Sequence, residues 1–298
     1  MSYMLSLDKK KIFAAEFRQR LEQKIELPPL PEVARELLML RNRANTEIEG
    51  LTNILKRDPA IAAQLLGYAR LSVFGYGDRI KTLNEAVQLV LGYDKALHMA
   101  MGMAAGKSLQ MQAEGPLGRK AFWQHSLRTA MLTQTLGAAL PAAQQPHAGI
   151  SYLAGLLHDI GYMLFGHLYP KEFAMLNQLV SSHPDREVRD IELLGFGVNH
   201  DMIGRWLMQS WGMPEELVVA AGEHYFFDYD GRHAIYPKLV ALANQLLKIE
   251  DADSALASCN ELILPSTLGL DDEKVNRALK RMREVSPQFD IIARELAA

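Results

Sequence analysis

Residues 152–165 read YLAGLLHDIGYMLF. This run is apolar almost all round, which is typical of a helix that is buried on every side. A histidine and an aspartate, His158 and Asp159, nevertheless lie at its centre. Because an ionised carboxylate is costly to bury without a partner, we expect Asp159 to face a cation, a cluster of hydrogen-bond donors or a water-filled pocket.

Helical patterns extend on both sides of this run, and no part of the chain shows a sustained alternation of apolar and polar residues. We expect helices near residues 8–25, 32–41, 47–56, 60–71, 82–90, 121–140, 148–165, 170–179, 185–194, 200–210, 214–224, 236–249 and 272–286. The predicted fold class is therefore all-α.

Capping residues mark several of these helix starts. Asp58 precedes Pro59, which combines an N-cap acceptor with a proline at the first helical position. Segments 46–49 (TEIE) and 82–85 (TLNE) match the capping box, in which the hydroxyl and the carboxylate each accept a backbone N–H. Pro287 is expected to end the last helix, because proline lacks a backbone donor.

Residues 112–119 interrupt the helical patterns with Gly115, Pro116 and Gly118, and this stretch predicts a junction between two helical lobes. The expected parts are an N-terminal helix (1–26), a first helical lobe (27–110), a second helical lobe (111–255) and a C-terminal helical tail (256–298). The predicted architecture is a two-lobed helical bundle.

Composition limits the classes of function. The 298 residues are 49% hydrophobic and 22% charged, which excludes disorder as the main state. The net charge is −3, and the lysines and arginines are scattered, so nucleic acid is not expected as a direct ligand.

The expected location is cytoplasmic. The single cysteine, Cys259, excludes an internal disulfide and fits a reducing compartment. The N-terminal residues lack the apolar core of a signal peptide, and no apolar run reaches the ~20 residues that cross a membrane. We therefore expect no membrane association.

Three further histidines, His125, His200 and His224, lie in other expected helices. Together with His158 and Asp159 they give a helical bundle the ligands for a metal site in its core. Imidazole and carboxylate suit iron, manganese, zinc or nickel better than calcium. Such an ion would lower the pKa of a bound water toward ~7 and supply hydroxide for attack on a phosphate ester. The alternative is a site without metal, in which His125 and backbone donors hold Asp159.

The other ionisable residues receive no part in this site. Histidines that lie in expected loops or lack an expected partner are His98, His147, His167, His183 and His233. Glu223, which precedes His224, is expected to be an exposed acid at the rim, with orientation of the His224 ring as the alternative.

The motif at 158–161 (HDIG) resembles the signature of the HD superfamily of metal-dependent phosphohydrolases. The wider order of motifs resembles its HDOD branch, the HD-related output domain. The similar segments are 27–31 (LPPLP), 57–59 (RDP) with 65–66, 80–92, 123–126, 156–161, 200–204 and 211–214. The resemblance covers about residues 20 to 255 and implies that 111–255 is an HD-like lobe.

The resemblance also implies which residues correspond to metal ligands. They are His125 as the first histidine, His158 and Asp159 as the His-Asp pair, and His200 and His224 as the additional histidines of the HD-GYP branch.

Two positions depart from the enzymes. Asn244 occupies the place of a later aspartate, where an amide adds no negative charge, and Tyr162 stands where HD-GYP phosphodiesterases carry a lysine. HDOD proteins are generally regarded as regulatory or scaffolding modules that have lost hydrolase activity.

The resemblance thus implies a bacterial-type regulatory module for signal transduction that lacks hydrolase activity. It is compatible with a metal ion bound in the HD-like site. The alternative is a metal-dependent phosphohydrolase acting on a nucleotide or cyclic dinucleotide, with Asp159 as its catalytic residue. The expected partner is a signalling protein in trans or a small nucleotide, and the oligomeric state is left open.

Overall fold

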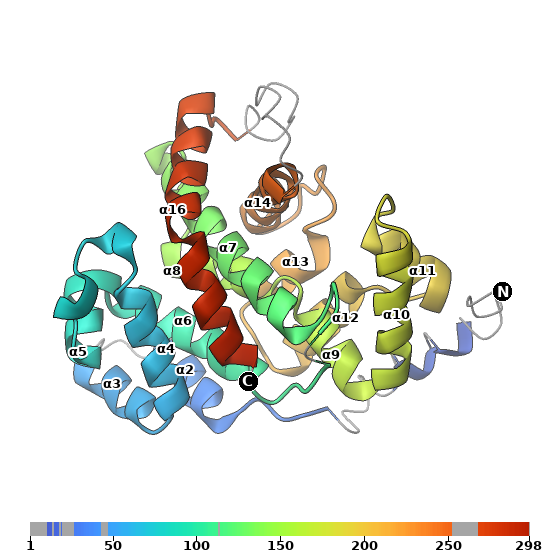
Figure 1. The fold of residues 1–298 in the computed structure, drawn as a ribbon, viewed down its shortest axis with the longest axis horizontal. Helices are drawn as coiled ribbons and strands as arrows, with labels where there is room; N and C mark the ends of the chain where they lie inside the picture. The colour runs from blue at the N-terminus through green and yellow to red at the C-terminus, as the bar shows by residue number, and fades with distance from the viewer. Residues whose placement is uncertain are drawn as a thin grey trace.

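The computed structural model describes residues 11–13, 15–17, 19, 27–42, 47–112, 114–251 and 268–297. Within these ranges every regular element is a helix and no strand occurs, so the predicted all-α class is confirmed (Figure 1). Thr46, Cys259 and most of the predicted helix 8–25 lie outside the described residues.

Short helices form the first part of the chain. They are α2 (Glu32–Arg41), α3 (Ile48–Lys56), α4 (Pro59–Ala69), α5 (Leu83–Glu85) and α6 (Tyr93–Gly106), with the 3-10 turns η1 (Ser72–Phe74) and η2 (Gly77–Arg79) and the π-helical η3 (Ala86–Leu91). After them come α7 (Arg119–Ala138), η4 (Ala142–Gln144), α8 (Ala148–Leu157), α9 (Ile160–Leu168), α10 (Pro170–Ser182), α11 (Val188–Phe196), α12 (His200–Ser210), α13 (Glu215–Glu223), α14 (Ile235–Asp251) and α16 (Asp272–Ala297).

Two of the predicted caps form as expected. Asp58 Oδ1 accepts a hydrogen bond from the backbone N–H of Ile61 over 3.2 Å at the start of α4. Thr82 and Glu85 form a complete capping box at the start of α5, with bonds of 3.1 and 3.0 Å. These contacts are local in sequence, which is why the sequence alone predicts them.

The predicted helix 148–165 is wrong as a single helix. The chain turns at His158 and Asp159, which separate α8 from α9. Asp159 has φ −96° and ψ 14°, outside the helical region. The two helices pack against different neighbours. Helix α8 packs against α6 and α7, whereas α9 packs against α12, and the turn between them allows both helices to make these contacts. It also allows two adjacent side chains to approach one centre, although on a straight helix they diverge by about 100°.

The prediction that Pro287 ends the last helix is also wrong, because α16 continues to Ala297. Beyond the proline, Phe289 and Ala293 are fully buried, and Gln288 Oε1 accepts a hydrogen bond from the backbone N–H of Ser72 over 3.1 Å. Packing of this last part of α16 outweighs the backbone hydrogen bond that the proline removes.

A continuous hydrophobic core crosses the boundary that the sequence predicts near residue 110. It includes Leu65 of α4, Met101 of α6, Leu156 of α8 and Ile203 of α12. A second cluster joins α7, α14 and α16, and α7 packs against both of the other helices although they are far apart in sequence (Figure 1). Helix α8 contacts α6, α7, α13 and α14.

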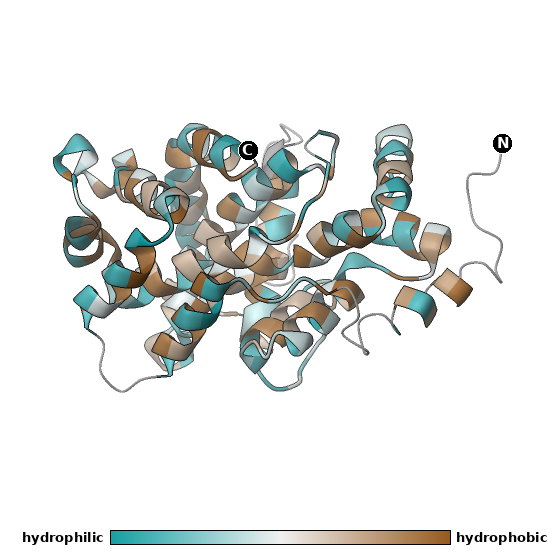
Figure 2. Cartoon of the chain, turned by 90° about the horizontal axis from the view of Figure 1, so that it is seen from below, coloured by the Kyte–Doolittle hydropathy of each residue, from teal (hydrophilic) through white to brown (hydrophobic). Residues whose placement is uncertain are grey.

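Most helices carry hydrophobic and hydrophilic residues together, as Figure 2 shows. Among the described helices, none combines the length and the apolar character that a transmembrane span needs.

Candidate metal centre

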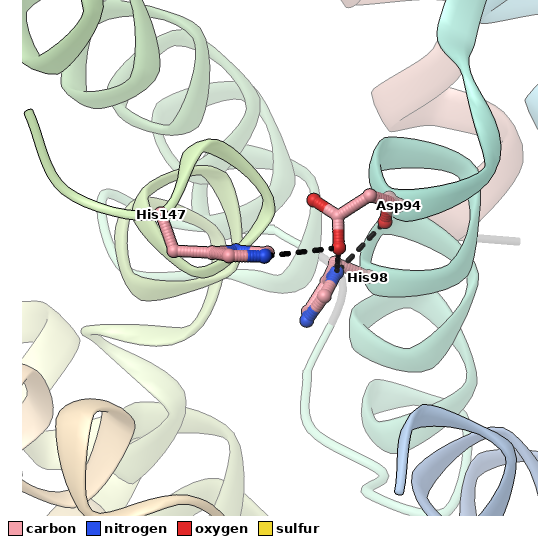
Figure 3. Close-up of side chains that lie close together, drawn as sticks. All are labelled: Asp94, His98 and His147. Carbon is pink, nitrogen blue, oxygen red and sulfur yellow. Dashed lines mark hydrogen bonds and ion pairs between the residues drawn. The ribbon is translucent and has the colours of Figure 1, made fainter. Parts of the chain in front are cut away.

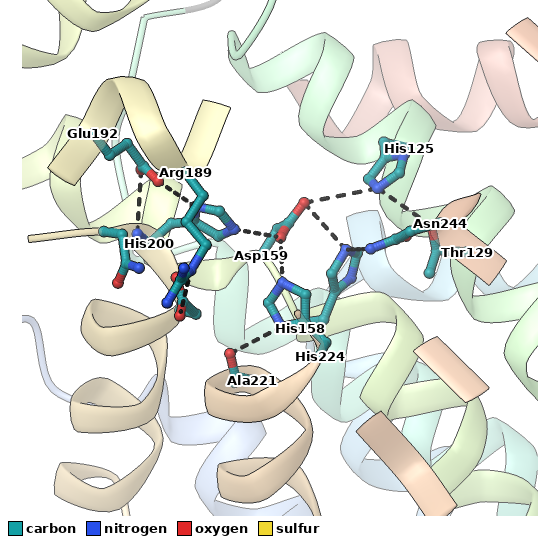
Figure 4. A network of polar contacts seen from close by, with 12 residues as sticks. His125, Thr129, His158, Asp159, Arg189, Glu192, His200, Ala221, His224 and Asn244 are labelled. Atoms are coloured by element: carbon teal, nitrogen blue, oxygen red, sulfur yellow. Dashed lines mark hydrogen bonds and ion pairs between the residues drawn. The ribbon is translucent and has the colours of Figure 1, made fainter. Parts of the chain in front are cut away.

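Four imidazoles surround the carboxylate of Asp159 (Figure 4). Asp159 Oδ2 lies 3.1 Å from His158 Nε2 and 3.7 Å from His125 Nε2. Asp159 Oδ1 lies 3.3 Å from His200 Nε2 and 3.6 Å from His224 Nε2. All five residues that the sequence singled out as ligands are therefore brought to one centre.

Five separate elements position these side chains and the predicted Asn244. His125 projects from α7, and His158 and Asp159 form the turn between α8 and α9. His200 is the first residue of α12, and His224 follows the last residue of α13. Asn244 comes from α14.

The cluster divides into two triads that share Asp159. The first triad is His125, His158 and Asp159, and the second triad is Asp159, His200 and His224. In each triad the three possible ligand atoms lie within 4.8 Å of one another. Oδ2 of Asp159 faces the two imidazoles of the first triad, and Oδ1 faces the two imidazoles of the second triad.

In the second triad both imidazoles direct Nε2 toward Asp159. His224 Nδ1 donates to the backbone carbonyl of Ala221 over 3.0 Å, which leaves the lone pair on Nε2. His200 Nδ1 lies 2.6 Å from Glu192 Oε2, and the Glu192 side chain also accepts from the His200 backbone N–H. Both Nε2 atoms are buried and make no well-formed hydrogen bond within the described structure. Orphaned buried nitrogens beside a carboxylate fit a divalent transition metal ion.

Glu192 contacts the candidate site, although the sequence does not single it out. Its side chain is fully buried on α11. A carboxylate that holds the distal nitrogen of a ligand histidine is a common feature of metal sites, because it fixes the ring and strengthens the ligand. The available sequence signal is a glutamate between Ile191 and Leu193, in the apolar half of α11, eight residues before His200.

Charge in the second triad is set by burial and by close partners. Burial lowers the pKa of His200, but the carboxylates of Glu192 and Asp159 outweigh it and raise the pKa to about 10. Burial holds the pKa of His224 well below its usual value, so this ring is neutral at pH 7. Burial raises the pKa of Asp159, but His158 and His200 hold it well below its usual range, and the carboxylate is ionised.

The first triad is arranged differently, because an amide occupies it. His158 Nδ1 donates to the backbone carbonyl of Gly155 over 2.8 Å, so its lone pair is on Nε2. Asn244 Nδ2 lies 3.2 Å from that Nε2 and donates to it. Thr129 Oγ1 donates to Asn244 Oδ1 over 3.2 Å, which holds the amide in this orientation. The lone pair that a metal ion needs from His158 is thus already used.

A cavity of about 680 Å³ opens beside the centre. Its lining includes His125, Asp159, Glu187, Arg189, Asp190, His224, Tyr225, Phe227, Asn244, Gln245 and Lys248. The cations in this wall already have partners: Arg189 Nε lies 3.4 Å from Asp201 Oδ2, and Lys248 pairs with Glu187. The cavity volume lies within the range of small-molecule sites.

Two further residues near the centre have definite places. Tyr162, at the position of the expected lysine, stacks on the His200 ring with centroids 4.0 Å apart. Glu223 pairs with Arg205, and backbone carbonyls of α13 hold the His224 ring instead. Glu223 is therefore not the group that orients His224.

Comparison with known families agrees with this architecture. The model of the HDOD domain matches residues 27–227. The chain belongs to the HDOD domain family. The matched region contains His125, His158, Asp159, His200 and His224, while Asn244 lies beyond its end.

Solved structures resemble this HDOD protein over its whole length. A protein from Marinobacter aquaeolei VT8, described as a candidate signal transduction protein, is 28% identical with a TM-score of 0.81, over 100% of this chain and 68% of that one. An HDOD domain protein from Geobacter sulfurreducens is 20% identical with a TM-score of 0.73, over 98% and 99% of the two chains. At 20% identity, the similarity to the Geobacter sulfurreducens protein shows only that the two proteins share a fold.

Among curated sequences, an uncharacterized protein of Treponema pallidum (strain Nichols) is 26% identical over 234 residues. The alignment covers 77% of the HDOD protein described here but 44% of the relative. The chain thus spans less than half of that relative's length.

Proposed function

We propose that this HDOD protein is a regulatory module for signal transduction that holds one divalent transition metal ion in the second triad and does not hydrolyse phosphoesters. The contrast between the triads carries this proposal. His200 and His224 each direct a buried Nε2 without a well-formed hydrogen bond toward Asp159, whereas Nε2 of His158 is already bonded to Asn244. The similarity to the candidate signal transduction protein of Marinobacter aquaeolei supports the regulatory role.

Iron, manganese, zinc and nickel are the ions that the ligand chemistry favours. Asp159, His200 and His224 would hold the ion, and Glu192 would orient His200. When bound, such an ion supplies Lewis acidity. The loss of a negative charge at Asn244 argues against a second ion beside it, and two-ion sites are the usual arrangement for displacement at phosphorus.

The alternative, a metal-dependent phosphohydrolase acting on a nucleotide or cyclic dinucleotide, is favoured by one observation. The cavity of about 680 Å³ reaches His125, Asp159 and His224 from outside. A small nucleotide fits a cavity of this size either as a substrate or as a regulatory ligand. The protein would hydrolyse the nucleotide if it is a substrate and would leave it intact if it is a regulatory ligand.

Metal content of the purified protein tests the proposed metal site. Asp159→Asn removes the carboxylate of the second triad, and we expect it to lose one ion per chain relative to the wild type. His125→Ala is the matched control, because His125 belongs only to the first triad and its side chain is already 36% exposed. We expect His125→Ala to retain the ion. Loss of the ion in both variants, or in neither, would contradict the assignment.

Hydrolysis of a generic phosphodiester in added manganese tests the regulatory role. We expect the wild type to turn over no faster than Asp159→Asn. Turnover by the wild type that Asp159→Asn abolishes would establish the phosphohydrolase instead.

A further inference from the structure

A second group of metal-ligand side chains lies at the opposite end of α8 from Asp159 (Figure 3). Asp94 and His98 lie one turn apart on α6, and His147 is the N-cap residue of α8. With a rise of about 1.5 Å per residue, the ten residues of α8 place this group roughly 15 Å from the turn that carries Asp159. The sequence predicts no partner for His98 and His147, which is wrong, because Asp94 pairs with both.

The distances in this group match those between ligands of one metal ion. Asp94 Oδ1 lies 3.3 Å from His98 Nδ1 and 3.3 Å from His147 Nε2. In a tetrahedral zinc site with bonds of 2.0–2.1 Å, ligand atoms lie about 3.3 Å apart. All three possible ligand atoms lie within 4.8 Å of one another.

The neighbouring backbone is shaped for this close approach. A Cβ on Gly149 would clash with both Asp94 Oδ2 and His98 Nδ1. The His98 side chain is 1% exposed, so it is held in place, whereas His147 and Asp94 are about half exposed and reachable by an ion from solvent. Burial raises the pKa of Asp94, but His98, His147 and the backbone N–H of Gly149 hold it below its usual value, which keeps the carboxylate ionised.

The hydrogen bonds that an ion would displace are few. His98 Nδ1 also lies 2.7 Å from the backbone carbonyl of Asp94, and an ion there would move the ring proton to Nε2, which has no hydrogen-bond partner in the described structure. His147 Nδ1 accepts from the backbone N–H of Ile150 over 3.4 Å, a long bond that contributes little. Both imidazoles can therefore present a lone pair to the same point, and the bonds to the ion must offset the lost hydrogen bond and the buried Nε2–H of His98.

We infer that Asp94, His98 and His147 bind a second divalent transition metal ion, with zinc as the best match, and that this ion clamps α6 to the N-terminus of α8. Two imidazoles and one carboxylate form a three-ligand set with a further position for water. The remaining side faces a cavity of about 490 Å³ lined by Arg41, Asn42, Tyr93 and Leu97. The clamp joins the first predicted lobe to the second, and it does not depend on the proposed role of the Asp159 centre.

The experiment uses the full chain after removal of metals with a chelator. His147→Ser removes an exposed ligand, and serine preserves an N-cap acceptor for α8, so the fold is expected to survive. Titration with Zn²⁺ alone, followed by elemental analysis after desalting, should give one ion fewer per chain in His147→Ser than in the wild type. Zn²⁺ should also raise the Tm of the wild type more than that of the variant, because the site exists only in the folded state.

His183→Ser is the matched control, because His183 is exposed and bonds only to its own helix. It should bind as many ions as the wild type. The comparison is repeated in chains that carry Asp159→Asn, where the difference of one ion should persist. Equal stoichiometry in the wild type and His147→Ser, or loss of the difference when Asp159 is replaced, would overturn the inference, whatever happens at the Asp159 centre.

Discussion

Glu192 and His200 form a buried pair in which the carboxylate oxygen and the ring Nδ1 are 2.6 Å apart and both side chains are completely buried. The pair lies on the side of His200 that faces away from Asp159. The glutamate therefore holds the ring in place and directs Nε2 toward the centre.

Replacing Glu192 by glutamine should weaken metal binding at the second triad without removing a ligand. Glutamine retains an acceptor for His200 Nδ1 but not the negative charge, and loss of such a partner typically costs 10–100-fold in affinity. Competition with a chromophoric chelator measures the change in Kd. Glu187→Gln, which alters an exposed glutamate on the cavity wall, is the control and should retain the wild-type affinity. An unchanged Kd in Glu192→Gln would show that the pair serves only the fold.

Asn244→Asp should open the first triad. A carboxylate cannot donate to His158 Nε2 and adds a negative charge near His125, so we expect one additional ion per chain by elemental analysis. Without metal the variant should have a lower Tm, because two carboxylates then approach each other, and the added ion should restore it. Asn244→Leu removes the amide without adding charge and should gain no ion. A gain in both variants would mean that the amide blocks the triad only by its hydrogen bond.

Lys95 should give the stability of the fold a pH dependence above neutrality. Its Nζ lies 5.0 Å from the centroid of the Tyr68 ring and 5.3 Å from that of Phe74. Burial, and to a smaller extent the charge of Arg281, lower its pKa from 10.5 to about 7. Between these two values the unfolded chain holds a proton that the folded chain has released, so the free energy of unfolding rises with pH.

The measurement is urea unfolding of the wild type and Lys95→Met at intervals from pH 7 to pH 10. The free energy of unfolding of the wild type minus that of the variant should increase with pH over this window, because methionine has no proton to release. Parallel curves for the two proteins would show that Lys95 titrates normally.

Gly161→Ala should destabilise the protein by more than about 3 kcal/mol. A Cβ at Gly161 would clash with the backbone carbonyl of His200, where α9 crosses α12. Backbone cannot move aside as a flexible side chain can. Gly195→Ala is the control, because a Cβ there meets nothing within 4 Å, and it should stabilise α11 by about 0.5–1 kcal/mol. Chemical unfolding measures the free energy of unfolding of each variant. Similar values for Gly161→Ala and Gly195→Ala would contradict the close approach of α9 and α12.

The sequence by itself determined the helical class and many helix limits, because these depend on neighbours in the chain. Helices α2 and α12 begin and end at the predicted residues, and Asp58 caps α4 as expected. It also identified the five residues that meet at Asp159, through the order of motifs that resembles the HDOD family.

Only the tertiary structure decided how those residues are arranged. The turn at His158 and Asp159 depends on packing of α8 and α9 against different helices. The amide of Asn244 meets His158 across 86 positions of sequence, and His147 meets Asp94 between two helices. Periodicity and caps record interactions within about four residues, whereas hydrogen bonds between distant helices depend on how the core packs, so no local pattern contains them.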